Sequence, residues 1–579
     1  MTGSETIDRP QRSARKPPRV LRRLASVAKV VREAVGWRRR GIAFLAGALS
    51  VLAMAPFFLW PVLFFTLPVL IWLIDGTSDQ ALAHAEADKA THTRAWRTSL
   101  KRAAFDGWWF GFGYFFFGLF WIGEAFLVEA HIFGWLLPVA VTLMPAGLAL
   151  FTAVTAAAAR SFWVPGLSRV AVLAVAFGVG EWLRGHIFTG FPWNVLGYAL
   201  TQPLYLMQST AVFGIYGLTL LTVLIAATPV IVLADPRTPR PGAKIVALTV
   251  APLAALFIYG ALVLAPGPNS FVDGVKLRIV QPSIPQHEKW LASEQPRIFA
   301  EHLRLSRISE SGKQDDLEGV THVFWPEAAM PFLPLSTPDA LSAIGTLLPA
   351  NTFLVAGALR LEKASVGDEL RPSTLPKRQV YNSIIAFGPE GETRAIYDKI
   401  HLVPFGEYLP AQEFLEAIGL ESLTRIRGGF SIGSTPRPLV SVPGLPPFSP
   451  LICYEAIFPA AVVQGENRPA LLVNATNDGW FGNTTGPHQH LHQARLRAVE
   501  EGVALLRVAN NGISAVIDPF GRIIGKLDLN EVGTLDTQLP QPRPATIYAQ
   551  YGDGLFLLCV LALSLTTWII VQYNRYAAR

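Results

Sequence analysis

Pro450-Leu451-Ile452-Cys453-Tyr454-Glu455 is the stretch of sequence that decides the fold of the second half of the chain. A short apolar run, typical of a buried strand, passes directly into a cysteine and then into a polar turn or helix. A lone cysteine beyond a buried strand is a candidate nucleophile, although Cys453 on its own fits a small buried hydrophobic residue better. The other cysteine, Cys559, lies inside an apolar run. Two cysteines exclude a disulfide framework and a four-cysteine zinc site.

Short apolar runs of strand length recur on both sides of this stretch, and helix-like stretches at 288–310 and 487–502 lie between some of them. The strand-like runs are 275–280, 322–325, 353–357, 383–387, 451–454, 471–474 and 514–517. Strands that alternate with helices are typical of a layered α/β domain, here of sandwich type. The polar, proline-punctuated stretch 361–378 is the best candidate for a loose insertion.

The rest of the chain is too apolar for a purely soluble enzyme. Of the 579 residues of the whole chain, 51% are hydrophobic and 16% are charged, whereas a soluble domain has about 25% charged residues. A bilayer core of about 30 Å requires about 20 apolar residues per helix. Candidate runs are 41–57, 59–75, 105–128, 132–157, 168–187, 206–234, 245–265 and 553–573. We therefore expect a membrane α-helical bundle of about eight transmembrane helices.

The positive charge of the chain is concentrated at its N-terminus. The net charge is +7, but residues 1–40 hold 12 Lys and Arg against three acidic residues, so the remaining residues sum to −2. Basic flanks next to apolar runs mark the cytoplasmic side of a membrane, which disfavours a nucleic-acid-binding patch. Bases recur in the connections at 76–104, 158–169 and 235–244, and they are nearly absent around 129–131 and 188–205. This alternation predicts that both termini are cytoplasmic.

These patterns divide the chain into four expected parts. A basic cytoplasmic arm occupies 1–40, and a transmembrane bundle of seven helices occupies 41–266. An extracytoplasmic α/β domain, periplasmic in a bacterium, follows at 267–552. The last transmembrane helix and a cytoplasmic tail occupy 553–579.

Two further segments of the α/β domain place a charge at the end of an apolar run. Glu327 follows Trp325-Pro326, and Lys399 stands at the start of the run that leads to Glu407. Each could be a surface charge on a strand end, but a charge next to a buried strand is costly unless it is used. A thiol, a carboxylate and an ammonium group at three strand ends would supply a nucleophile, a base and a stabiliser of negative charge.

The motifs Trp-Pro-Glu at 325–327, Asp-Lys-Ile-His-Leu-Val-Pro-Phe-Gly-Glu at 398–407 and Ile-Cys-Tyr-Glu at 452–455 together resemble the nitrilase, or carbon–nitrogen hydrolase, superfamily. With apolar spans around such a domain, the chain resembles one family within it, the apolipoprotein N-acyltransferases. Further matching stretches are 280–290, 381–383, 477–490 and 510–514. The likeness covers nearly the whole chain after the basic arm, whose role it does not explain.

The resemblance implies a nitrilase-like αββα sandwich with a Glu-Lys-Cys triad. In it, Cys453 would be the nucleophile, Glu327 the general base and Lys399 the oxyanion stabiliser. The resemblance also implies supporting roles for Glu407, Tyr454 and Glu455, and substrate-binding roles for Trp290, Asn382 and Trp480. Glu407 is also compatible with a salt-bridged surface residue. No metal is expected, because the alternating His488, His490 and His492 do not share a face of a helix.

The implied reaction transfers an acyl chain from a phospholipid to the α-amino group of the S-diacylglyceryl-cysteine at the N-terminus of an apolipoprotein. It would proceed by a ping-pong mechanism through a thioester on Cys453 and would give a triacylated lipoprotein. The implied partners are the phospholipid, the apolipoprotein and the lipid bilayer of the bacterial inner membrane. No cofactor or nucleic acid is implied, and a monomer is expected.

Two other functions fit parts of the sequence. A membrane-tethered amidase or nitrilase would use the same triad and let water resolve the thioester, but one membrane span would be enough to tether it. A transporter with an appended regulatory domain should have polar, interrupted helices at the middle of the membrane. Here the ionisable residues of the apolar runs lie mainly near their ends.

Overall fold

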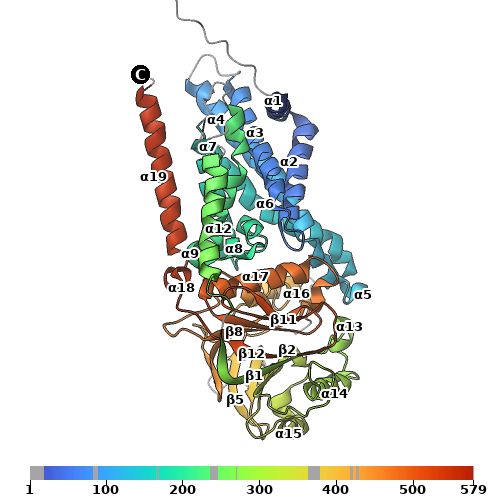
Figure 1. Cartoon of the computed structure of the whole chain (residues 1–579). Coiled ribbons are helices and arrows are strands. Elements are labelled where there is room, and N and C mark those ends of the chain that lie inside the picture. The colour runs from blue at the N-terminus through green and yellow to red at the C-terminus, as the bar shows by residue number, and fades with distance from the viewer. Residues whose placement is uncertain are drawn as a thin grey trace, which may run out of the picture.

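The computed structural model describes residues 19–82, 89–164, 166, 168–234, 246–268, 270–362, 379–417, 422–424 and 429–577. It has two parts, a tall bundle of helices and, beneath it in Figure 1, a domain built on β-sheets. Several sequence predictions fall outside the described residues. These are the first 18 residues of the basic arm, most of the insertion at 361–378, the bases Arg237, Arg240 and Lys244 of one connection, and Arg579 of the tail.

Helices of 6 to 30 residues, most of them apolar, make up most of the bundle in the described residues. They are α1 (Arg19–Glu33), α2 (Gly36–Ser50), α3 (Leu63–Leu82), α4 (Lys89–Gly118), α6 (Leu137–Ser161), α7 (Ser168–His186), α9 (Thr210–Ala226), α10 (Pro229–Ala234), α12 (Ala251–Leu264) and α19 (Gly554–Ala577). Shorter pieces connect them: η1 (Val51–Ala53), η2 (Trp60–Val62), η3 (Phe120–Phe126), α5 (Ala130–Phe133), η4 (Gly134–Leu136), η5 (Leu196–Leu200), α8 (Leu204–Met207) and η6 (Val246–Val250).

Five helical segments in the described part of the chain are long and apolar enough to cross a membrane, fewer than the eight predicted. They are Trp60–Thr77, Ala130–Ser161, Thr210–Ile231, Ala247–Leu264 and Gly554–Tyr573. The other three predicted runs are also largely helical, but α2 has only 15 residues. Helix α4 begins with a strongly basic half, and α7 contains Arg169, Glu181 and Arg184. These charges reduce the apolar length that each helix offers to lipid.

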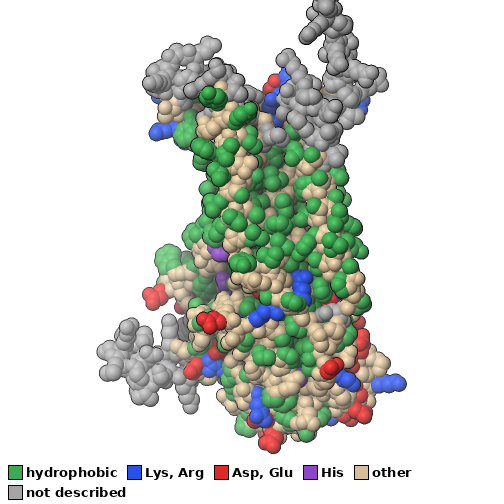
Figure 2. All heavy atoms as spheres, turned by 60° about the vertical axis from the view of Figure 1, so that its left-hand side comes forward, with side chains coloured by type: hydrophobic (Ala, Val, Ile, Leu, Met, Phe, Trp, Pro, Cys, Tyr) green, Lys and Arg blue, Asp and Glu red, His purple; other side chains and the backbone are tan. Residues whose placement is uncertain are grey.

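The charges inside the bundle are paired with one another. The Arg39 guanidinium on α2 lies 2.6 Å from the Asp106 carboxylate on α4, and Arg169 lies 2.6 Å from Asp75. Outside, Figure 2 shows hydrophobic side chains covering most of the helical part, whereas acidic and basic side chains gather on the lower domain. A bundle that hides its charges in pairs and presents an apolar surface fits a lipid environment.

The strands of the lower domain form two six-stranded sheets in the described residues. The first has the order β12 (Gly533–Pro540), β1 (Phe271–Gln281), β2 (His322–Met330), β3 (Phe353–Glu362), β4 (Gln379–Phe387) and β5 (Thr393–Asp398). The second has the order β11 (Ile523–Leu527), β10 (Ser514–Ile517), β9 (Ala504–Ala509), β8 (Leu471–Thr476), β7 (Leu445–Ile452) and β6 (Val440–Val442). In each sheet three central strands run parallel, β1-β2-β3 and β7-β8-β9, and antiparallel strands flank them.

The two sheets pack face to face and are covered by helices on the outside. Phe324 of the first sheet and Phe448 of the second belong to one buried cluster between the sheets. Ile344 packs against the outer face of the first sheet, and Ala498 against the outer face of the second. The helices of the domain are α13 (Gln286–Lys289), α14 (Gln295–Ser306), η7 (Pro334–Ser336), α15 (Pro338–Leu347), α16 (Gln412–Ala417), η9 (Cys453–Ile457), η10 (Asp478–Phe481), α17 (Gly486–Glu501) and α18 (Ile547–Tyr551). This order of helix, sheet, sheet and helix is the layering that the sequence resemblance implies.

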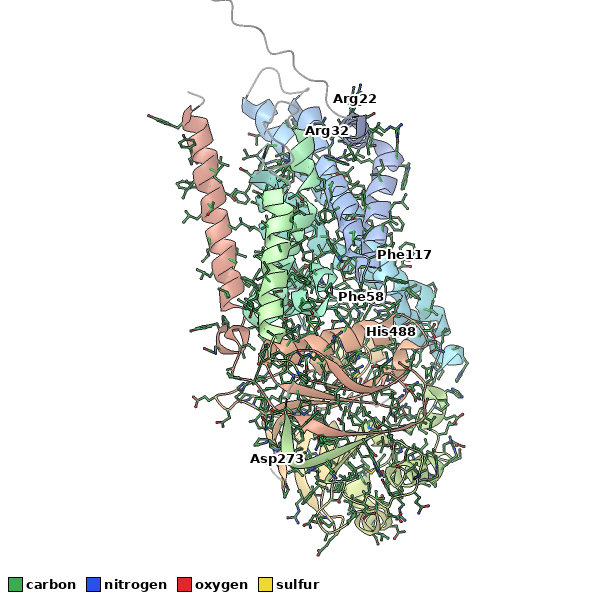
Figure 3. All side chains as sticks on the ribbon, in the orientation of Figure 1. Arg22, Arg32, Phe58, Phe117, Asp273 and His488 are labelled. Atoms are coloured by element: carbon green, nitrogen blue, oxygen red, sulfur yellow. The ribbon has the colours of Figure 1, made fainter. Side chains whose placement is uncertain are left out.

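Helix α17 lies between the second sheet and the bundle (Figure 1). Its Gln489 Oε1 accepts hydrogen bonds from the indoles of Trp193 (2.7 Å) and Trp121 (3.2 Å), which both belong to the bundle. Its His492 ring packs 4.8 Å from Phe58, near the lower end of the bundle in Figure 3. The domain is therefore fixed to the bundle through buried polar and aromatic contacts.

Candidate active site

Three strands bring the three predicted triad residues together. Glu327 lies in β2, Lys399 directly follows β5, and Cys453 directly follows β7. All three are buried, with 8%, 1% and 7% of their surfaces exposed. The Lys399 Nζ lies 3.9 Å from Glu327 Oε1, and electrostatic coupling links both groups to the Cys453 thiol. The arrangement thus places a carboxylate and an ammonium group around one thiol.

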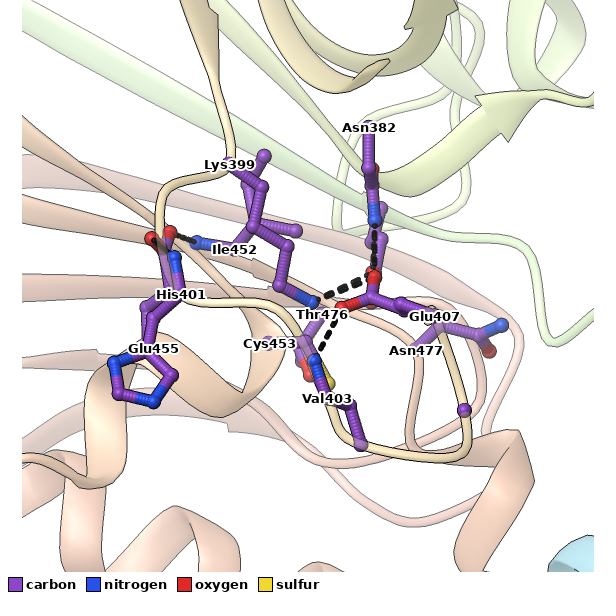
Figure 4. Close-up of polar contacts among 12 residues, drawn as sticks. Asn382, Lys399, His401, Val403, Glu407, Ile452, Cys453, Glu455, Thr476 and Asn477 are labelled. Atoms are coloured by element: carbon purple, nitrogen blue, oxygen red, sulfur yellow. Dashed lines mark hydrogen bonds and ion pairs between the residues drawn. The ribbon is translucent and has the colours of Figure 1, made fainter. Parts of the chain in front are cut away.

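Glu407 holds the lysine from the opposite side. Its Oε1 accepts a 2.8 Å hydrogen bond from Lys399 Nζ, and its Oε2 accepts a 2.8 Å bond from the Val403 backbone N–H. Figure 4 shows Lys399, Asn382 and Val403 meeting at Glu407, close to Cys453. Glu407 is 7% exposed, so it is a buried partner of the lysine and not a surface residue.

Asn382 lies between the two carboxylates. Its Nδ2 donates to Glu327 Oε1 at 2.8 Å and to Glu407 Oε1 at 3.1 Å. Its Oδ1 is buried without a hydrogen-bond partner in the described structure. The strand β4 presents this amide, and the Asn382 carbonyl also accepts the Lys399 backbone N–H at 2.9 Å. Asn382 therefore fixes the positions of Glu327 and Lys399 through its side chain and its backbone carbonyl.

Glu455 ties the lysine strand to the cysteine strand. Its Oε1 accepts the backbone N–H groups of Ile400 (3.0 Å) and His401 (3.1 Å), and its Oε2 accepts that of Ile452 (2.8 Å). The Arg437 guanidinium lies 3.2 Å away. Burial acts to raise the pKa of Glu455, but the charge and hydrogen bond of Arg437, the Ile452 backbone N–H and Lys399 together lower it below its usual value. A carboxylate that is ionised at neutral pH thus holds the chain just beyond Lys399 against the residue before Cys453.

Cys453 is held in a conformation unusual for a side-chain-bearing residue. Its φ is +50°, a left-handed value that a non-glycine residue keeps only when its surroundings fix it there. The Cys453 carbonyl accepts hydrogen bonds from Asn474 Nδ2 (3.3 Å) and His490 Nε2 (3.1 Å). His490 Nδ1 in turn lies 2.9 Å from Asp478 Oδ1. These contacts, whose roles the sequence did not indicate, define the position of the thiol.

Burial governs the protonation of the site. It raises the pKa of Cys453 to about 12, and the Glu327 carboxylate acts in the same direction while Lys399 opposes it. Burial also raises the pKa of Glu327, again against the effect of Lys399. For Lys399, the carboxylates of Glu407 and Glu327 outweigh burial and raise the pKa above its usual value. At neutral pH the resting site therefore contains a thiol, which requires a base before it can act as a nucleophile.

The remaining predicted residues are Tyr454, Trp290 and Trp480. Tyr454 follows the cysteine, and its hydroxyl donates to the Gly190 carbonyl of the bundle at 2.9 Å. Trp290 directly follows α13 and is 39% exposed. Trp480 lies in η10 and is partly exposed. Partly exposed aromatic side chains beside a buried centre can contact an acyl chain.

The alternating histidines have separate partners. His490 belongs to the network behind Cys453, and His492 hydrogen-bonds to the Thr201 hydroxyl at 2.7 Å. His488 lies at the junction of the two parts in Figure 3. Within the described ranges, no group of three or more His, Cys, Asp and Glu residues could hold a metal ion.

One further residue of the centre was not predicted. Lys289 is 1% exposed, and its Nζ donates a 2.8 Å hydrogen bond to the backbone carbonyl of Glu327. The only sequence signal was its place beside Trp290 in a matching stretch. Nothing in the local sequence shows that the lysine points inward while the tryptophan stays exposed.

Comparison with known proteins identifies the family. Residues 46–228 match the family model of the apolipoprotein N-acyltransferase N-terminal domain, and residues 277–546 match that of the carbon–nitrogen hydrolases. The apolipoprotein N-acyltransferase of Rhodopseudomonas palustris is 47% identical over 530 residues, which cover 92% of this chain and 95% of that protein. The chain belongs to the apolipoprotein N-acyltransferase family. Another apolipoprotein N-acyltransferase, from Bradyrhizobium diazoefficiens, is 46% identical and covers 92% of this chain and 95% of its own.

Membership of the apolipoprotein N-acyltransferase family confirms the resemblance drawn from the sequence and makes the chain an acyltransferase of the carbon–nitrogen hydrolase superfamily. Among solved structures, an amidase from Nesterenkonia sp. is 21% identical, with a TM-score of 0.29, and covers 47% of this chain and 93% of its own. A carbon–nitrogen hydrolase from Helicobacter pylori G27 is 13% identical, with a TM-score of 0.33, and covers 45% of this chain and 88% of its own.

Proposed function

We propose that the chain transfers an acyl group from a phospholipid to the α-amino group of a diacylglyceryl-cysteine at the N-terminus of an apolipoprotein. The observation that carries this proposal is the meeting of Glu327, Lys399 and Cys453 in a domain that is fixed to an apolar helical bundle. The thiol, carboxylate and ammonium group suit acyl transfer. The bundle suits substrates whose chains stay in lipid, since removing each CH₂ group from an apolar phase costs about 0.8 kcal/mol.

In the first half-reaction, Glu327 takes the proton of the Cys453 thiol and the thiolate attacks the ester carbonyl of the phospholipid. The Lys399 ammonium stabilises the negative oxygen of the tetrahedral intermediate. The C–O bond of the ester then breaks, and Glu327 returns its proton to the leaving oxygen. A thioester on Cys453 and a lysophospholipid result.

In the second half-reaction, the amine of the diacylglyceryl-cysteine attacks the thioester, and Glu327 accepts a proton from the attacking nitrogen. Lys399 stabilises the second tetrahedral intermediate. The C–S bond breaks, and Glu327 returns its proton to the Cys453 thiolate. An amide and the free enzyme result, so one nucleophile serves two substrates in turn and the kinetics are ping-pong.

The proposal also includes the subcellular location and the membrane topology of the chain. The apolar helices would span the bacterial inner membrane with both termini in the cytoplasm, and the sandwich of the second half of the chain would face the periplasm. Trp290 and Trp480 would line the acyl path, and Asn382, Tyr454, Glu407 and Glu455 would support the triad. One chain carries every residue of this site, so a monomer would be sufficient.

The test is the intact mass of the purified protein after incubation with phospholipid vesicles. We expect a gain of one acyl group that hydroxylamine removes. Cys453→Ala should abolish this gain, whereas the matched control Cys559→Ala should keep it. Addition of a diacylglyceryl peptide should then discharge the adduct onto the peptide amine. Absence of an adduct on the wild-type protein, or release of the acyl group to water alone, would contradict the proposal.

A further inference from the structure

Lys289 is a buried cation without a carboxylate of its own. It ends α13, it is 1% exposed, and no ion pair to it within 4 Å is found in the described residues. Burying an ammonium group is costly unless its charge and its hydrogen bonds are used. Its one hydrogen bond goes to a backbone oxygen, the Glu327 carbonyl at 2.8 Å. The position therefore requires an explanation beyond packing.

That carbonyl lies where strand β2 is irregular. The register of β2 on β3 shifts between Trp325 and Met330, and Ala328 has a φ of +46°. On the other side the backbone of β3 is very close, because a Cβ atom at Gly357 would lie 2.6 Å from the Glu327 Cα atom. The Lys289 ammonium thus holds the backbone of Glu327 at a break in the sheet.

The other end of α13 is attached to the second sheet. Gln286 Oε1 accepts a 2.7 Å hydrogen bond from Asn477 Nδ2, just after β8. The Ile284 backbone N–H donates to Asn510 Oδ1 at 3.1 Å, just after β9. Through Lys289 this segment therefore connects the sheet that carries Cys453 to the carbonyl of Glu327 in the opposite sheet.

The charges of the site also require a second cation. Glu327 and Glu407 are two buried carboxylates, and Lys399 alone would leave the group with a net negative charge. A negative environment opposes formation of a thiolate at Cys453. The Lys289 charge acts on both Glu327 and Cys453, and His302 of α14 also faces it. With Lys289 the group is neutral before the thiol proton moves.

We propose that Lys289 is a positioning residue of the acyl-transfer site, which fixes the backbone of Glu327 and supplies the second positive charge that the Cys453 thiolate requires. The proposal rests on the proposed function for its consequence on acyl transfer. Burial lowers the pKa of Lys289 to about 8, against the opposing effects of Glu327 and Cys453. The residue is therefore mostly charged at neutral pH and loses its charge in the mildly alkaline range.

The test measures alkylation of Cys453 by iodoacetamide at pH 7, in a Cys559→Ala background and without any lipid substrate. Lys289→Met removes the charge and the hydrogen bond, Lys289→Arg keeps a charge, and the exposed Lys313→Met is the matched control. A rise of about one unit in the pKa of the thiol slows alkylation about tenfold, because only the thiolate reacts. We expect that slowing in Lys289→Met and none in the control. Lys289→Arg should stay near the wild-type rate.

The direction of the change in alkylation rate distinguishes an electrostatic role of Lys289 from a purely structural one. Loosening of the site would expose the thiol and speed its alkylation, so a faster or unchanged rate in Lys289→Met would overturn the proposal. If Lys289→Met does not fold, Lys289→Gln replaces it with the same expectation. Failure of both to fold while Lys289→Arg folds would assign Lys289 to folding and also overturn the proposal. Because no substrate is present, the result does not depend on whether wild-type protein forms an acyl adduct.

Discussion

Lys399 and Glu407 form a buried ion pair of 2.8 Å, which is shorter than the 3.9 Å between Lys399 and Glu327. The nearer carboxylate is anchored by the Val403 backbone N–H. The lysine is therefore held mainly by a residue with no proton to transfer in the proposed reaction. Because Glu407 holds Lys399, Glu327 can act as the base of the proposed reaction while it lies 3.9 Å from the Lys399 ammonium group.

Replacing Glu407 by glutamine should lower the rate of acyl-enzyme formation without abolishing it. Glu407→Gln keeps the shape of the side chain but removes the charge that holds Lys399. We expect a loss of about tenfold, less than the roughly 10²–10³-fold loss for Lys399→Met, which removes the stabilising group itself. Single-turnover acylation followed by intact mass provides the measurement. Equal losses in the two variants would assign Glu407 a part in the chemistry.

Replacing Glu327 by glutamine should separate its two effects on the thiol. The carboxylate raises the pKa of Cys453, so its removal should lower that pKa. The same change removes the proposed base. Glu327→Gln should therefore react faster with iodoacetamide at pH 7 than the wild type, by about tenfold per unit of pKa, and yet form no acyl adduct. Exposed Glu413→Gln is the control, and slower alkylation in Glu327→Gln would contradict the electrostatic account.

The sequence motifs next to apolar runs grouped Glu327, Lys399 and Cys453 as an expected triad, and their catalytic roles stay a prediction. In the structure Glu327 lies inside β2, and Lys399 and Cys453 directly follow β5 and β7. The inward position of Lys289 could not be predicted, since the residue lies in a polar segment and its hydrogen bond goes to the Glu327 carbonyl in the irregular part of β2. A contact that depends on an irregularity in another strand produces no recognisable pattern in the sequence around Lys289.

In the bundle, the sequence predicts the helices but not the ion pairs between them. Hydropathy located most of its helices but could not reveal that Asp75 and Asp106 are neutralised by arginines on other helices. Arg39 and Asp106 are 67 positions apart in the sequence, so a hydropathy window of about one helix does not contain both residues. Eight apolar runs were predicted, but only five segments in the described part of the chain have the length and apolarity of a membrane span. The other three fall short because α2 has 15 residues and because α4 and α7 contain charged residues.

Acylation should have a bell-shaped dependence on pH. Glu327 must be ionised to accept a proton, and since burial raises the pKa of Glu327, the acid limb should lie above the range of an exposed glutamate. Lys289 must be charged, and its pKa of about 8 should give an alkaline limb there. The pKa of Lys399 is raised, so it stays charged throughout. In single-turnover profiles of acylation rate against pH, Lys289→Arg should move the alkaline limb to higher pH. An unmoved limb would show that another group titrates there.

Glu455 should matter first for stability and through it for the site. Its carboxylate accepts the backbone N–H groups of Ile400, His401 and Ile452 and is paired with Arg437. Removing one partner of a buried ion pair costs about 3–5 kcal/mol, because the other charge is left unpaired. Glu455→Gln should therefore lower the unfolding midpoint at pH 7 strongly, whereas the exposed Glu413→Gln should leave it unchanged.

The pH dependence of this loss has a definite sign. The pKa of Glu455 is lowered in the folded protein, so its stabilisation is fully present above the unfolded value of 4.5 and is lost as the pH falls below it. The difference in unfolding midpoint between wild type and Glu455→Gln should thus be constant near neutral pH and shrink in acid. Folded Glu455→Gln should also acylate more slowly, because the backbone that presents Lys399 is no longer fixed beside Cys453. A variant as stable as the wild type at pH 7 would show that Glu455 does not hold the two strands together.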